Sequence, residues 1–236
     1  ALLEAARKAG VGRFVFSSTA AVYGAPETVP LTTDHPRRPT SPYGTTKAQF
    51  ERVLEDYAAA YGLHAAALRY FNAAGASPDG TLTERHDPET HLLPIVLEVA
   101  RGTRPYLSIF GNDYDTEDGT AVRDYVHVSD LARAHVATLE RLGRVELPFA
   151  FNLGTGRGHS VRQVVQAVRD VTGAEVRTVD VCRRPGDVAT LIADPAVARM
   201  NLDWTPEWPD IHDMIRHVVA AQRRQKPGGH IVDQTK

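Results

Sequence analysis

The sequence predicts an α/β fold built on parallel strands, and the order of three segments near its start indicates this. Residues 14–16 are an apolar, β-prone run that ends in the hydroxyl side chains of residues 17–19, as expected for a buried strand. A helix is expected at 42–61, and a second strand follows it at 65–70. A strand, a helix and a further strand in this order form a βαβ unit, in which the two strands run parallel.

The long helix at 42–61 has the clearest boundaries of the expected elements. Ser41 is a favoured N-cap residue, and Pro42 suits the first helical position. Gly62 marks the end of the helix, because glycine readily adopts the conformation that closes one.

Glycine, serine and proline mark other boundaries along the chain. Gly10 is the expected C-cap of a helix at 2–9, and Ser160 is the expected N-cap of a helix that ends at Thr172. A short helix is expected after Pro195, and a polar tail rich in Gly, Gln and Lys ends the chain and is expected to fray. The remaining expected elements are a strand at 13–17, a helix near 91–101, strands near 107–110 and 121–126, a helix from Ser129-Asp130 through Arg141, strands at 149–152 and 175–181, and a helix near 209–224.

Composition excludes several classes of protein. The 27 basic and 29 acidic residues give a net charge of −2, so the broad basic field of a nucleic-acid-binding protein is absent. The single cysteine, Cys182, excludes an internal disulfide and fits a reducing cytoplasm. No apolar run approaches the roughly 20 residues of a membrane span, so we expect neither a membrane nor a nucleic acid as partner.

The first residues look like the interior of a larger protein. The sequence opens inside a helix, without an initiating Met and without an N-cap residue. We therefore expect the natural N-terminus to lie upstream of Ala1.

Tyr43 and Lys47 form the most informative pair in the sequence. They are four residues apart at the start of the long helix, so their side chains share one face. A free phenol has a pKa of about 10 and is a poor base at neutral pH. A neighbouring ammonium stabilises the phenolate, so the pair is suited to proton transfer. An ordinary amphipathic helix carrying both residues is the alternative.

Together, the segments 14–24 and 41–47 resemble the extended short-chain dehydrogenase/reductase family. The resemblance implies the C-terminal part of a Rossmann-type doubly wound parallel sheet with an interwoven smaller α+β substrate domain. Residues 1–72 would be the remaining part of the dinucleotide-binding domain, without its first strands and glycine-rich turn. Residues 73–236 would be mainly the substrate-binding domain, with segments that return to the Rossmann part.

The same resemblance implies NAD as the cofactor. Thr19 would hydrogen-bond the reacting hydroxyl, and Tyr43 would be the acid and base. Lys47 would tune Tyr43 and hold the nicotinamide ribose. The implied NAD-binding residues are Ser17, Tyr43, Lys47 and Tyr70.

Two motifs carry the expected substrate contacts. Residues 69–72, Arg-Tyr-Phe-Asn, resemble a segment of sugar-nucleotide epimerases in which the Asn contacts the nucleoside diphosphate, although Asn72 also suits a simple turn. Residues 109–128 are the most family-specific block, and Arg123 within it offers the guanidinium fork that suits a diphosphate. By resemblance, the substrate-binding residues are Asn72, His91, Leu92, Ser108, Phe110, Arg123, Arg184, Asp187 and Leu191.

Two other patterns are interpreted as structural. The glycines at 154–158 follow a strand and precede a helix, but a dinucleotide-binding motif needs glycine where His159 stands, so a tight turn is expected. The acidic loop at 113–118 lacks the glycine and closing glutamate of a calcium-binding loop. The histidines show no ligand spacing, so no metal site is predicted.

The neighbours of Thr19 select among the family's reactions. Dehydratases of the family usually carry Asp-Glu after the Thr, whereas Ala20 and Ala21 stand here and cannot transfer protons. The resemblance thus implies inversion at carbon 4 of a UDP-hexose, the interconversion of UDP-glucose and UDP-galactose through a 4-keto sugar, by a cytoplasmic homodimer of galactose metabolism. The alternatives are a catalytically inactive nucleotide-sugar-binding fragment and an epimerase of UDP-N-acetylglucosamine, because the intermediate bulk of Leu191 leaves N-acetyl sugars open. The 236 residues alone are expected to be inactive.

Overall fold

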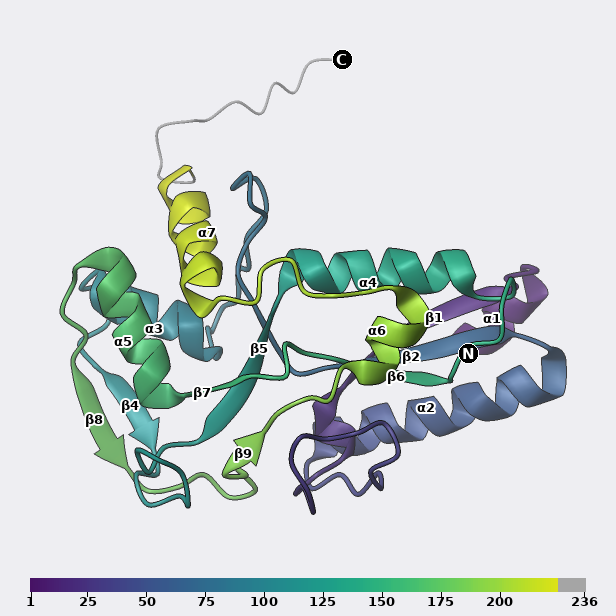
Figure 1. Cartoon of the computed structure of the whole chain (residues 1–236), viewed down its shortest axis with the longest axis horizontal. Helices are drawn as coiled ribbons and strands as arrows, with labels where there is room; N and C mark the ends of the chain where they lie inside the picture. The colour runs from purple at the N-terminus through teal and green to yellow at the C-terminus, as the bar shows by residue number, and fades with distance from the viewer. Residues whose placement is uncertain (225–236) are drawn as a thin grey trace.

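One half of the molecule is built on a parallel sheet of three strands (Figure 1). The computed structural model describes residues 1–224, and the polar tail expected to fray lies outside them. The strands are β1 (Arg13–Thr19), β2 (His64–Tyr70) and β6 (Ala150–Leu153), in the order β1-β2-β6. Both pairings are parallel, with Thr19 opposite Tyr70 at the carboxyl end. The predicted α/β class is confirmed.

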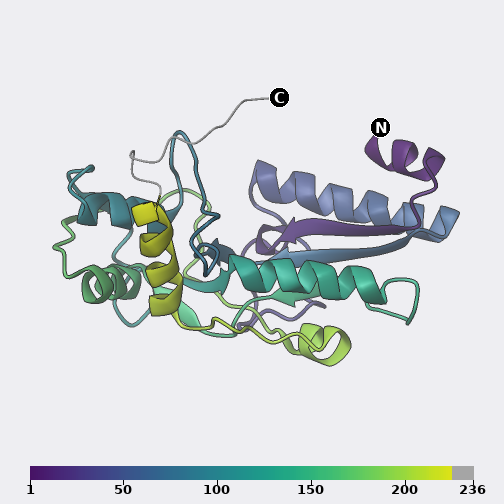
Figure 2. The same ribbon diagram turned by 90° about the horizontal axis from the view of Figure 1, so that it is seen from above.

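Helices cover both faces of this sheet, as a parallel sheet requires. Helix α2 (Pro42–Tyr61) lies on one face, and α4 (Val128–Arg141) lies on the other (Figure 2). The short helix α6 (Ala196–Leu202) packs beside α4. Apolar side chains of β2, β6, α4 and α6 form one continuous core there.

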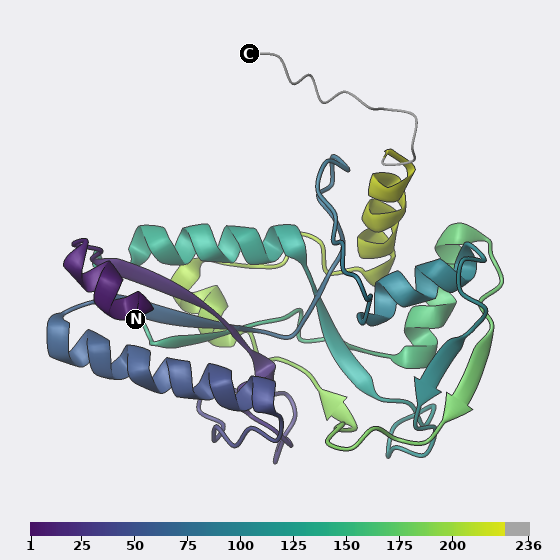
Figure 3. The same ribbon diagram turned by 180° about the vertical axis from the view of Figure 1, so that it is seen from behind.

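A second core lies in the other half of the molecule, among three helices and two strands (Figure 3). The helices are α3 (Leu92–Ala100), α5 (Val161–Thr172) and α7 (Ile211–Arg224). Strands β4 (Leu107–Phe110) and β8 (Thr178–Val181) pair in parallel beside them. Ser160 forms a capping box with Gln163 at the start of α5, where the sequence predicts the cap.

Strand β5 (Val122–His127) joins the two halves through three very short partners. It pairs with β3 (Asn72–Ala74) and β9 (Thr190–Leu191) in parallel and with β7 (Gly158–Ser160) in antiparallel. The sequence did not predict these partners, because two or three residues are too few to show a strand periodicity. The chain also contains α1 (Leu2–Lys8) and the 3-10 turn η1 (Ala20–Val22).

Helix α2 has the boundaries that its sequence predicts. The Ser41 hydroxyl accepts a hydrogen bond from the Gly44 N–H at 3.1 Å, and Gly62 closes the helix with a φ of 68°. A Cβ at Gly44 would overlap the carbonyl oxygen of Ala21, so only glycine lets the start of α2 approach η1 this closely.

Some boundaries differ from the prediction. Helix α4 begins at Val128, one residue before the predicted start at Ser129, and the imidazole of His127 caps it by accepting from the Ser129 N–H. Strand β8 begins at Thr178 instead of residue 175. Within residues 1–224, none of the helices combines the length and the apolar character of a membrane-spanning segment.

Candidate active site

A cavity of about 700 Å³ lies where β1 and β2 end. Ligands of open α/β sheets bind at the carboxyl ends of parallel strands, so this is the expected position of a site. Segments from β1, α2, β2, β3 and the start of α3 contribute to its wall. The predicted site residues that line it are Thr19, Tyr43, Tyr70, Asn72, His91 and Leu92.

The Tyr43 and Thr19 side chains meet in this cavity. Thr19 ends β1 and is nearly buried, whereas the Tyr43 ring is 55% exposed to the cavity and solvent. Partial burial raises the pKa of Tyr43, and a hydrogen bond with the Thr19 side chain offsets part of that rise. A phenol and a hydroxyl are therefore placed together as proton-transfer and hydrogen-bonding groups.

Lys47 lies beside Tyr43 but directs its hydrogen bond to the backbone. Its Nζ donates to the Ser17 carbonyl oxygen at 3.0 Å and lies 5.6 Å from the centroid of the Tyr43 ring. The pKa of Tyr43 is raised in this structure, and the lowering expected from Lys47 is not seen. The tuning role of Lys47 stays a prediction.

Ser17 has a side-chain partner that the sequence did not reveal. Its hydroxyl lies 2.9 Å from Nε2 of His135 on α4, and the His135 ring lies 6.3 Å from that of Tyr70. Neither Ser17 nor Lys47 lines the cavity. His135 was missed because it is distant in sequence and carries no motif.

A second cavity of about 610 Å³ adjoins the first. Asn72, His91 and Leu92 line both cavities, so these residues form a shared wall. The predicted residues found only in the second cavity are Ser108, Phe110, Arg123, Arg184 and Asp187.

Three arginines line this second cavity, and Arg104 among them is paired with Glu98 at 2.9 Å, which leaves Arg123 and Arg184 as the two predicted ones. The Arg184 guanidinium stacks 3.6 Å above the centroid of the Phe110 ring. Arg123 is 16% exposed, donates to the carbonyl oxygen of Val122 at 2.9 Å, and has Asp187 as a distant carboxylate at 4.0 Å. Burial lowers the pKa of Arg123, so a bound anion would stabilise its charge. The pair is suited to hold a phosphate group.

Leu191 lies apart from both cavities. It sits opposite Arg123 on β9 and packs on a small core formed by Tyr23, Leu31 and other buried residues. Eleven of the other thirteen predicted site residues line a cavity, and the remaining two, Lys47 and Ser17, are joined by a hydrogen bond beside Tyr43. Leu191 instead contributes to the support behind Arg123.

A buried charge network fixes α2 against the sheet, and the sequence did not reveal it. Glu51 of α2 is fully buried and accepts three hydrogen bonds from Arg69 of β2, the shortest at 2.7 Å. It also accepts one from Ser18 at 2.5 Å and one from Arg37 at 3.0 Å. Burial favours the neutral carboxyl, but the bonds from Arg69 and Ser18 outweigh this and lower the pKa of Glu51. Ser17 and Thr19 on either side of Ser18, and Tyr70 after Arg69, are predicted site residues, so this network holds their strands beside α2.

The glycine-rich loop at 154–158 is a turn built around a carboxylate. The N–H groups of Thr155 and Gly156 donate to the buried Asp124 carboxylate at 2.8 and 3.0 Å. Burial raises the pKa of Asp124, and these bonds partly offset the rise. The amides that would hold a phosphate are occupied, so the loop is not a dinucleotide site.

The family model described as "NAD dependent epimerase/dehydratase family" matches residues 1–154. The chain is 50% identical to the UDP-glucose 4-epimerase of Lacticaseibacillus casei over 91% of its own length and 65% of that protein's. It is also 50% identical to the UDP-glucose 4-epimerase of Corynebacterium glutamicum, over 91% of this chain and 64% of that one. The chain thus spans just under two thirds of the length of these curated relatives.

Solved structures show the same similarity. The UDP-glucose-4-epimerase of Stenotrophomonas maltophila, with bound NAD and formylated UDP-arabinopyranose, superposes with a TM-score of 0.89 at 42% identity and covers 94% of this chain and 67% of its own. The Bifidobacterium longum enzyme, in complex with NAD+ and UDP, gives a TM-score of 0.90 at 39% identity, over 97% and 68% of the two chains. Because the family model matches more than half of the chain, the chain belongs to the NAD dependent epimerase/dehydratase family.

Proposed function

We propose that the protein containing this chain is a UDP-glucose 4-epimerase, which inverts carbon 4 of a UDP-hexose. One observation carries the proposal: the cavity that holds Tyr43 and Thr19 shares a wall with a second cavity, which Arg123 and Arg184 line. A sugar linked to a diphosphate needs these two environments side by side. Relatives that bind NAD and UDP support the same assignment.

The residues near Tyr43 fit the nicotinamide end of NAD. Tyr43 and Lys47 lie together at the carboxyl end of β1, with Tyr43 open to a cavity and Lys47 half-buried. Lys47, Ser17 and Tyr70 are the residues that we propose hold this end of the cofactor. Bound NAD would supply the acceptor and donor of hydride at carbon 4.

The chain's own residues would bind the substrate and move its proton. Arg123 and Arg184 would hold the diphosphate, and Asn72, His91 and Leu92 would line the passage between the cavities. Ser108, Phe110 and Asp187 would complete the nucleotide end. Thr19 would hydrogen-bond the 4-hydroxyl while Tyr43 takes its proton, and the 4-keto sugar would turn about the anchored diphosphate before Tyr43 returns the proton.

The turn after Thr19 argues against elimination of water. Ala20 and Ala21 form η1 beside Thr19, and Ala20 is buried. Neither side chain can act as the extra acid or base that a dehydration needs. The site therefore favours epimerisation over dehydration.

Organisation and assembly are parts of the same proposal. We infer a dinucleotide-binding part at 1–72 and a substrate-binding part at 73–236, with β6, α4 and α6 returning to the sheet. A cytoplasmic homodimer acting in galactose metabolism follows from the resemblance. The exposed apolar side chains of Val136 and Leu139, three residues apart on α4, are candidate dimer contacts.

A coupled assay on the full-length protein tests the proposed activity. UDP-galactose should be converted to UDP-glucose in the presence of NAD, without net accumulation of the reduced cofactor. UDP-N-acetylgalactosamine as a parallel substrate reports whether the sugar pocket accepts an N-acetyl group. Tight UDP binding without conversion of either sugar would contradict the epimerase and favour a nucleotide-sugar-binding protein.

A further inference from the structure

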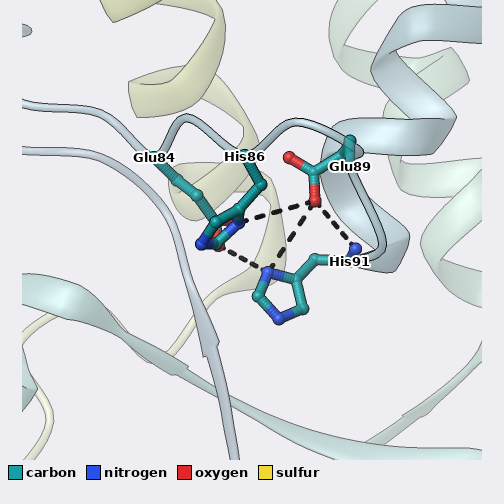
Figure 4. A group of neighbouring side chains, drawn as sticks. All are labelled: Glu84, His86, Glu89 and His91. Carbon is teal, nitrogen blue, oxygen red and sulfur yellow. Dashed lines mark hydrogen bonds and ion pairs between the residues drawn. The ribbon is translucent and has the colours of Figure 1, made fainter.

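Four potential metal-ligating side chains meet in the segment before α3 (Figure 4). They are Glu84, His86, Glu89 and His91, and one ligand atom of each lies within 4.8 Å of all the others. The segment lines the first cavity, and Glu89 and His91 also line the second. Sequence analysis predicted no metal site, because this spacing matches no familiar ligand motif.

The distances within this group suit a tetrahedral ion. A zinc ion with bonds of about 2.0–2.1 Å separates its ligand atoms by about 3.3 Å. Nδ1 of His86 lies 3.0 Å from Oε1 of Glu84 and 3.8 Å from Oε1 of Glu89. Nδ1 of His91 lies 2.5 Å from Oε1 of Glu84 and 3.9 Å from Oε1 of Glu89. Small movements of the side chains would bring these atoms to equal distances from a common centre.

Hydrogen bonds and burial already orient part of the group. Oε1 of Glu89 accepts from the N–H groups of Thr90 and His91, each at 2.8 Å, and the Glu89 side chain is 10% exposed. In Figure 4 both imidazole rings turn a nitrogen toward the carboxylates. A site whose ligands are held in place loses less side-chain freedom when it binds an ion.

Electrostatics also favours a cation between these side chains. Two carboxylates this close repel each other, and a dication at their centre converts the repulsion into attraction. Imidazole nitrogen is a ligand for zinc and its transition-metal neighbours, whereas magnesium and calcium prefer oxygen alone.

We propose that Glu84, His86, Glu89 and His91 bind one transition-metal dication, with Zn²⁺ as the best-fitting ion. The ion ties the segment 84–91 to the beginning of α3, beside the wall shared by the two cavities. It occupies Nδ1 of His91, so the other ring nitrogen and the main chain remain for a nucleotide. His91 is shared with the proposed nucleotide site, but metal binding can be measured without NAD, UDP or turnover.

Metal titration of the chelator-treated protein tests this assignment. Calorimetry with ZnCl₂ should show one equivalent bound, and CoCl₂ should produce the visible absorption of a tetrahedral Co²⁺ centre. His86→Gln should weaken zinc binding by at least about tenfold, because even loss of a residue that only supports a ligand costs about 10–100-fold. Glu84→Gln is a second variant with the same expected direction.

His212→Gln is the matched control. His212 is an exposed histidine with two nearby carboxylates, Asp210 at 2.9 Å and Asp170 at 3.6 Å, outside the cluster. This variant should keep the zinc affinity of the parent protein. Unchanged affinity in both His86→Gln and Glu84→Gln, or an equal loss in His212→Gln, would overturn the proposal. Circular dichroism of each variant verifies the fold. Zinc affinity is measured without NAD or substrate, so it is tested separately from turnover.

Discussion

At the scale of single residues, Tyr43 and Arg123 act in different cavities and their substitution should separate chemistry from binding. Tyr43 offers a hydroxyl beside Thr19, and Arg123 offers a partly buried charge without a close carboxylate. The Tyr43 hydroxyl contributes to the proton transfer alone. The Arg123 charge would bind the diphosphate before the reaction begins as well as during it.

Tyr43→Phe in the full-length protein should lower epimerase turnover by at least about a hundredfold, because a general acid and base contributes roughly that much or more. UDP affinity should stay near that of the parent protein, because the phenyl ring remains. Steady-state kinetics and a UDP titration measure the two effects. Turnover within a few fold of the parent would remove Tyr43 from the proposed mechanism.

Arg123→Ala should weaken UDP binding by about 1.5–3 kcal/mol, or roughly tenfold to a hundredfold, because a charge-assisted hydrogen bond is lost. Arg162→Ala is the control, since Arg162 is an exposed arginine that pairs with Asp180 and lines neither cavity. Calorimetric titration with UDP compares them. Equal affinities for the parent and Arg123→Ala would place the diphosphate elsewhere.

At the scale of elements, the start of α2 determines where Tyr43 lies. Gly44 allows α2 to contact the backbone of η1, and Thr19 immediately precedes η1. The position of the phenol relative to Thr19 therefore depends on a residue that has no side chain.

Gly44→Ala should destabilise the fold by about 1–3 kcal/mol and lower turnover, because the new methyl group overlaps the Ala21 carbonyl oxygen. Gln49→Ala, an exposed substitution in the same helix, should change neither property appreciably. Denaturant unfolding and the epimerase assay measure the pair. A Gly44→Ala protein as stable and active as Gln49→Ala would show that α2 need not approach η1 so closely.

Glu51→Gln should destabilise the fold by about 3 kcal/mol at pH 7, because it leaves the buried Arg69 guanidinium without its counter-charge. Glu55→Gln is the matched control one turn along α2, where the carboxylate pairs with Arg37 and is 29% exposed. The folded state lowers the pKa of Glu51 below its ordinary value of 4.5, so its stabilisation is present above that pH. As pH falls through the lowered pKa, the difference between parent and Glu51→Gln should vanish. A difference independent of pH from 7 to 3 would contradict this network.

The sequence predicted elements where local signals are strong. Helices α2 and α5 carry their own capping residues, so their limits were predictable from Ser41 and Ser160. Strands β3, β7 and β9 have no local signal and form only because β5 lies beside them. The residues of known motifs were predictable as site residues. The roles of Glu51, His135 and the four side chains between Glu84 and His91 were not, because they arise from contacts between distant or irregular segments.

At the scale of the whole molecule, the 236-residue chain alone should bind NAD weakly and show no turnover. The residues that we assign to NAD hold only its nicotinamide end, and the amides of the loop at 154–158 are occupied by Asp124. Calorimetry with NAD and the epimerase assay on the purified chain measure this, with UDP as a positive control for a folded second cavity. Tight NAD binding together with turnover would contradict the expectation.

The return of β6 to the sheet has a consequence for the order of folding. This strand pairs with β2 only after the chain has passed through β5 and α4, and its Asn152 side chain bonds to Tyr23 and to the Leu31 carbonyl oxygen. Closing so long a loop costs entropy before the new contacts repay it, so β6 should join late and slowly. During synthesis, β1 and β2 therefore leave the ribosome before β6, α4 and α6, and the apolar side chains that these elements cover stay exposed until then. Chaperone binding to such nascent chains should persist until β6 has emerged.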